Sequence, residues 1–87
     1  MKILQIKDII RKDVPIYYRR HFSGIAVMEV LSKSIERRVD FMIETKPTGA
    51  KEISLSVSDP VDYPLAPLLK ELKNFVINLD DAGGLPG

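Results

Sequence analysis

The chain has 87 residues, enough for one domain, and 13 Lys and Arg against 12 Asp and Glu leave a net charge of +1. Hydrophobic residues make up 45% and charged residues 29% of it, which is typical of a globular protein and argues against disorder. The absence of Cys excludes disulfides, zinc–thiolate sites and thiol nucleophiles. No apolar run approaches the roughly 20 residues of a membrane span, and the start has no signal-peptide pattern. We therefore expect a cytoplasmic location and no membrane partner.

The charge is spread unevenly along the chain. Residues 1–51 hold 11 Lys and Arg against 6 Asp and Glu, whereas residues 52–87 hold 2 against 6. Such an asymmetry can mark a basic surface for an acidic partner, or it can reflect attraction between the two halves, in the fold or between subunits. We favour attraction between the halves, because charged residues usually form ordinary solvated surface.

The N-terminal segment 1–12 has an ambiguous pattern. Ile6 and Ile10 fit both a helical face and one side of a strand, and Asp8 interrupts the alternation. We expect a short segment that forms an extended start, a helical turn, or both. It should end at Val14, because a proline follows and pushes that residue out of the helical region.

The next stretch, residues 15–32, predicts a β-hairpin. Its strands would cover 16–22 and 25–31, joined by a two-residue turn at Ser23 and Gly24. Such a turn sets the register, and the register assigns every side chain to a face. The face assigned to the core carries Ile16, Tyr18, Arg20, Phe22, Ile25, Val27, Glu29 and Leu31. The opposite face carries Tyr17, Arg19, His21, Ala26, Met28 and Val30.

Two more strands are expected before the helix. Residues 32–36 are mostly polar and predict a connection, followed by a third strand over 37–44 and a loop over 45–50. The fourth strand, 51–58, has the cleanest alternation, which is typical of a sheet with one wet face. Its two faces carry Ile53, Leu55 and Val57 on one side and Ser54, Ser56 and Ser58 on the other.

The stretch 64–79 predicts an amphipathic helix. Asp62 can cap its first turn, and Gly83–Gly84 provides a stop signal. We expect Asp80–Asp81 to lie mostly beyond the last turn, because acids are disfavoured at the negative end of a helix. The apolar residues that fall in one stripe are Leu65, Leu68, Leu69, Leu72, Phe75, Val76 and Leu79.

These elements predict a fold of the α+β class. It is a four-stranded antiparallel β-meander with one C-terminal amphipathic helix packed on one face of the sheet. Residues 1–81 would form a single domain, and residues 82–87 would be a flexible tail.

The sheet face that the helix leaves open is the predicted interaction surface. Its apolar residues can be covered by the N-terminal segment, by a second copy of the protein, or by another partner. We expect a non-catalytic binding or accessory domain that acts through protein–protein interaction or self-association, with a homodimer as the favoured assembly. The surface residues are Tyr17, Arg19, His21, Met28, Val30, Arg38 and Met42.

Nucleic-acid binding is the alternative function. Tyr17, Arg19, Arg37 and Arg38 could stack bases and contact phosphates on an open sheet. Asp40 opposes this, since it would repel a nucleic-acid backbone. A meander followed by a helix resembles the double-stranded-RNA-binding domain in topology. The start of this helix, however, is acidic and apolar where that family places lysines.

No residue pattern predicts catalysis. His21 is the sole histidine, and no base stands near the alternating serines to activate one of them. No carboxylates have the spacing of a metal loop, and no glycine-rich phosphate loop is present. We therefore expect no enzyme activity, no metal and no cofactor.

Overall fold

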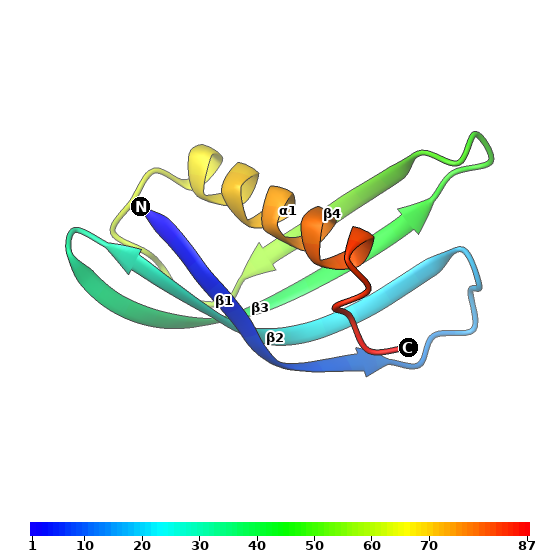
Figure 1. Cartoon of the computed structure of the whole chain (residues 1–87), viewed down its shortest axis with the longest axis horizontal. Helices are drawn as coiled ribbons and strands as arrows, with labels where there is room; N and C mark the ends of the chain where they lie inside the picture. Colours follow the sequence, from blue (N-terminus) through cyan, green and yellow to red (C-terminus); the bar gives the residue numbers. More distant parts are fainter.

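The computed structural model describes all residues from 1 to 87 as a four-stranded antiparallel sheet followed by one helix (Figure 1). The strands lie in chain order across the sheet. This confirms the predicted α+β meander with a C-terminal helix. The elements are β1 (Lys2–Lys12), β2 (Arg19–Val30), β3 (Lys33–Thr45), β4 (Lys51–Val57) and α1 (Leu65–Asp81).

The predicted first hairpin is wrong. β2 runs without interruption from residue 19 to residue 30, and Ser23 and Gly24 lie in its middle. The tight turn is instead at Leu31 and Ser32, whose φ angles of 51° and 63° suit a type I′ hairpin. The predicted connection at 32–36 is therefore mostly the start of β3.

The N-terminal segment is a full strand, β1, with no helical turn. It pairs with β2 and contains a bulge where the register passes from Lys7 opposite Ile25 to Ile10 opposite Ser23. Asp8 in this bulge has a φ of 53°. The bulge explains why the alternation along this segment looked broken.

Gly24 allows β1 to approach β2 closely at the bulge. A Cβ atom on Gly24 would lie 3.0 Å from Cγ2 of Ile6 and 3.1 Å from the carbonyl oxygen of Lys7. A side chain at this position would therefore displace β1 or distort the bulge. The glycine serves close strand packing, and this is the physical reason why it does not mark a turn.

A continuous β2 changes the assignment of its faces. The alternation passes through Gly24 unbroken, so Met28 and Val30 share a face with Phe22 and are buried under the helix. Ile25 and Val27 lie on the other face, opposite to the prediction. The buried core consists of Ile6, Phe22, Ala26, Met28, Val30, Val39, Phe41, Ile43, Ile53, Leu68, Leu72 and Val76.

The helix α1 packs along β4 and also approaches β1, so the sheet curls around it (Figure 1). Leu68, Leu72 and Val76 are its buried residues, whereas Leu65 at its start is 63% exposed. The predicted apolar stripe therefore faces the core along most of its length.

Both helix ends show how the chain satisfies its free backbone groups. At the C-terminal end, Gly83 has a φ of 72° and the N–H of Gly84 donates to the carbonyl of Leu79 at 2.8 Å. This confirms the glycine stop signal. At the N-terminal end, Pro64 is the capping residue and no side chain caps the first turn, so the cap predicted for Asp62 is absent.

Candidate functional site

A cluster of ion pairs fixes the end of the helix on the sheet. Asp80 accepts hydrogen bonds from Arg20 at 2.8 and 2.9 Å and from Lys51 at 2.7 Å. Lys51 also reaches Asp81 at 3.3 Å. Both acids lie inside the last turn of α1, so their predicted position beyond it is wrong. The two cations offset the unfavourable dipole interaction, and they link the basic first half of the chain to its acidic second half.

This cluster changes the acidity of its members. The hydrogen bonds from Arg20 lower the pKa of Asp80 from 3.8 to about 2, with Lys51 acting in the same direction. The same hydrogen bonds to Asp80 and Asp81 raise the pKa of Lys51. The cluster is therefore a structural clamp in which all groups stay charged near neutral pH.

The open face of the sheet is crossed by ion pairs between neighbouring strands. Their partners sit on different strands and their side chains are partly exposed, so each pair contributes little by itself. Together they neutralise most of the charge on this face. The pairs are Lys7–Glu36 at 3.0 Å, Lys12–Asp40 at 3.0 Å and Arg19–Glu44 at 2.7 Å.

The structure separates the residues of the predicted interaction surface. Met28 and Val30 are wrong as surface residues, because they are 0% and 5% exposed in the core. Tyr17 is 97% exposed, but it lies in the connection before β2. Arg19 is held by Glu44.

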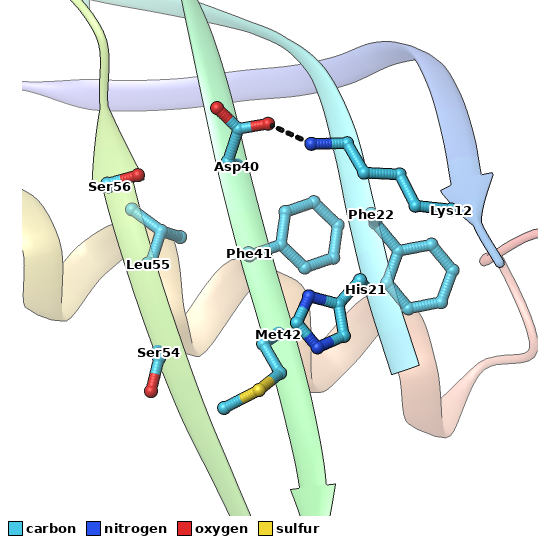
Figure 2. Close-up of a pocket in the computed structure, with 9 residues that line it drawn as sticks. All are labelled: Lys12, His21, Phe22, Asp40, Phe41, Met42, Ser54, Leu55 and Ser56. Atoms are coloured by element: carbon cyan, nitrogen blue, oxygen red, sulfur yellow. Dashed lines mark hydrogen bonds and ion pairs between the residues drawn. The ribbon is translucent and has the colours of Figure 1, made fainter. Parts of the chain in front are cut away.

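Of the predicted set, only His21 and Met42 face each other directly, as register partners on β2 and β3. The nearest charge to Arg38, Asp40, is 3.9 Å away. His21 and Met42 line a hollow of about 310 Å³ on the open face, where Lys12 reaches across to Asp40 (Figure 2). No group of three or more His, Asp or Glu side chains in the chain is placed to hold a metal ion.

The two edges of the sheet differ. The β1 edge is interrupted by two register shifts, one at Leu4 and one at Asp8, which disturb its line of free backbone groups. It is also strongly basic. Bulges and charges of this kind protect an edge strand from pairing with another chain. The basic residues of β1 are Lys2, Lys7, Arg11 and Lys12.

The β4 edge has no such protection. Its pairing with β3 is regular over the whole strand, and the stretch Ile53–Val57 contains no charge, no proline and no bulge. An unprotected edge presents a row of free N–H and C=O groups that can template another strand.

The ladder shows which peptide groups of β4 are free. The N–H of Ser58 donates to the carbonyl of Arg38 at 3.0 Å, so this pair is hydrogen-bonded. Hydrogen-bonded pairs alternate along an antiparallel ladder, and Ser54 and Ser56 therefore bond to β3. The peptide groups of the residues between them point away from β3, towards the free edge. These residues are Ile53, Leu55 and Val57.

A groove of about 580 Å³ lies between this edge and the helix. Apolar side chains of Ile53, Leu69 and Ile77 line it, and Lys70 and Lys73 stand on its helix side. Ile77 lies outside the main apolar stripe of the helix, and this was the one signal in the sequence for the groove. The face of β4 that borders the groove is thus apolar, and its far face carries serines.

The comparisons with known proteins place the chain in a family. A family model described as the BB-0187 family matches residues 1–81. The chain belongs to this family. No curated protein and no solved structure matches it. No helix of this family member is long and apolar enough to cross a membrane. Since the family description names no activity, function has to be argued from the surfaces described above.

Proposed function

We propose that the protein is a non-catalytic binding module that takes up an extended polypeptide segment along the free edge of β4. The observation that carries this proposal is the contrast between the two sheet edges. β1 is bulged and basic, whereas β4 is regular and uncharged over Ile53–Val57. Natural proteins protect free edges unless a partner strand pairs there.

The groove beside β4 supports the same proposal. A strand that pairs with Leu55 and its neighbours would turn every second side chain towards Ile53, Leu69 and Ile77. Main-chain hydrogen bonds would provide affinity, and the apolar groove would select apolar residues at alternate positions. The proposed binding site therefore lies at the edge of the sheet, and the ion-paired open face is its neighbour.

Peptide selection tests this function. A random decapeptide library would be selected on the protein, and the recovered peptides should alternate apolar and polar residues and lack proline. Leu55→Pro removes the outward N–H of β4 without removing a bond to β3, and it should weaken peptide binding about tenfold or more. Leu55→Ala is the matched control, because it shortens the same side chain and keeps the N–H.

Two results would overturn the proposed function. One is a selection that recovers no peptide with alternating residues. The other is equal binding of the recovered peptides to Leu55→Pro and Leu55→Ala variants, both shown to be folded by circular dichroism. That result would move the binding site away from the β4 edge.

A further inference from the structure

We infer that the strand bound at the β4 edge is β4 of a second copy, giving a two-fold dimer with one continuous sheet of both chains. This inference rests on the proposed function and names the partner of the same site. It follows from the sequence of β4, from the direction of its free peptide groups, and from the charges at the two ends of the groove.

The sequence of β4 is symmetric about Leu55. The stretch Ile53–Val57 reads apolar, Ser, apolar, Ser, apolar in either direction. A strand that meets its own copy in antiparallel orientation, with the two-fold axis at Leu55, would place Ile53 opposite Val57 of the second copy. Ser54 would then lie opposite Ser56 of the second copy. Every side chain would face one of its own chemical kind, which is the self-complementarity that a two-fold interface requires.

The free peptide groups fit this register. Ile53, Leu55 and Val57 point their N–H and C=O groups to the edge, and this pairing sets each of them opposite another residue of the same set. They would form the hydrogen-bonded pairs of the new ladder, and the serines would form the pairs between them. Both helices would lie on the same face of the joint sheet, because paired residues of antiparallel strands point to the same side.

The charges also fit. The same register sets Lys51 opposite Asp59 of the second copy. The groove end at Lys51 is bordered by Lys70 and Lys73, so an incoming acidic residue would meet three cations there. In the isolated chain, Asp59 is exposed and has no ion-pair partner. The pairing would give it one, and it would bring no like charges face to face.

Two double variants of the full chain test the dimer by sedimentation over a range of concentrations. Ser54 and Ser56 are exposed on the open face, so charges there leave the core intact. The S54K/S56K variant would set two lysines opposite each other across the interface, twice per dimer, and should weaken association about tenfold or more. The S54K/S56E variant would place opposite charges there instead and should restore association to near that of the unchanged protein.

The outcomes separate this inference from the proposed function. A wild-type protein that remains monomeric at high concentration, or double variants that associate equally, would overturn the dimer. If such a monomer still binds the selected peptides at β4, the proposed function stands with a different protein as partner. A two-fold axis at Ser54 would bring the introduced lysine against its own copy in both variants, so rescue by S54K/S56E also decides the register.

Discussion

Arg20 and Asp80 join the start of β2 to the last turn of α1 through two parallel hydrogen bonds of 2.8 and 2.9 Å. The carboxylate is largely buried, with 8% of the Asp80 side chain exposed, against 27% for Arg20. Two-bond pairs of this geometry are the strongest type of side-chain ion pair. The pair therefore fixes how the helix end lies on the sheet.

Removing one partner of this pair should destabilise the fold. Arg20→Ala leaves a mostly buried carboxylate with only Lys51 to balance it, and we expect a loss of about 1–3 kcal/mol in the free energy of unfolding. Urea unfolding followed by circular dichroism measures this loss. Arg19→Ala is the matched control, because its pair with Glu44 is more exposed and should cost less than about 1 kcal/mol. Equal losses for the two variants would show that the buried pair has no special role.

The same pair predicts how stability depends on pH. The pKa of Asp80 is depressed to about 2 in the folded protein, so its contribution is fully present above its ordinary pKa of 3.8. This contribution is lost as the pH falls from 3.8 towards 2, because protons then bind the unfolded state more readily. Asp80→Asn should remove this part of the acid sensitivity. Urea unfolding at a series of pH values should show a shallower decline for Asp80→Asn than for the unchanged protein, and parallel curves would contradict the assignment.

Gly24 should tolerate no side chain. The added methyl of Gly24→Ala would meet Ile6 and the backbone of Lys7 at the β1 bulge, and we expect a destabilisation of about 1–3 kcal/mol. Thermal unfolding measures the change. Gly87→Ala is the control, since a Cβ atom there meets nothing within 4 Å. If Gly24→Ala were as stable as the control, the close approach of β1 would not depend on this glycine.

Nucleic-acid binding should be weak. Arg19 is paired with Glu44, and Arg37 donates to the carbonyl oxygens of Pro60 and Glu36 at 3.2 and 2.8 Å. These arginines also lie on opposite faces of the sheet. We expect little retention on a polyanion column at physiological salt, and no change on Arg19→Glu. Strong, salt-sensitive retention that Arg19→Glu abolishes would favour the nucleic-acid alternative instead.

The periodic parts of the chain were predictable from the sequence. The alternation along 51–57 and the helical period along 65–79 are set by one dominant interaction each, the burial of an apolar face. The glycine stop at Gly83 was also visible, because a positive φ favours glycine at that position. These elements account for the correct fold class.

The first half of the chain was misread because two local signals have a second cause. Gly24 looked like a turn residue, but it is there to let β1 approach. The real turn at Leu31–Ser32 uses residues that rarely adopt positive φ, so its sequence carries no turn signal. Moving the turn by this distance exchanged the two faces over the second half of β2, and Met28 and Val30 passed from the surface to the core.

The β4 edge was only partly visible from the sequence. The strand itself and its serine face were predicted, and Ile77 stood out as an apolar residue beside the stripe. Its place at the edge of the sheet depends on the order of all strands, which the misread hairpin did not change. The protection of the opposite edge, however, requires the bulges of β1, and these arise from long-range pairing with β2.

Amide hydrogen exchange along β4 tests most directly whether its free edge pairs with another strand. In the isolated chain, the N–H groups of Ser54 and Ser56 bond to β3, whereas that of Leu55 points outward. At high protein concentration we predict that Leu55 becomes protected to the same degree as the two serines, and that S54K/S56K reverses this protection. Fast exchange of Leu55 at every concentration, and in the presence of the selected peptides, would contradict both the strand pairing and the proposed function.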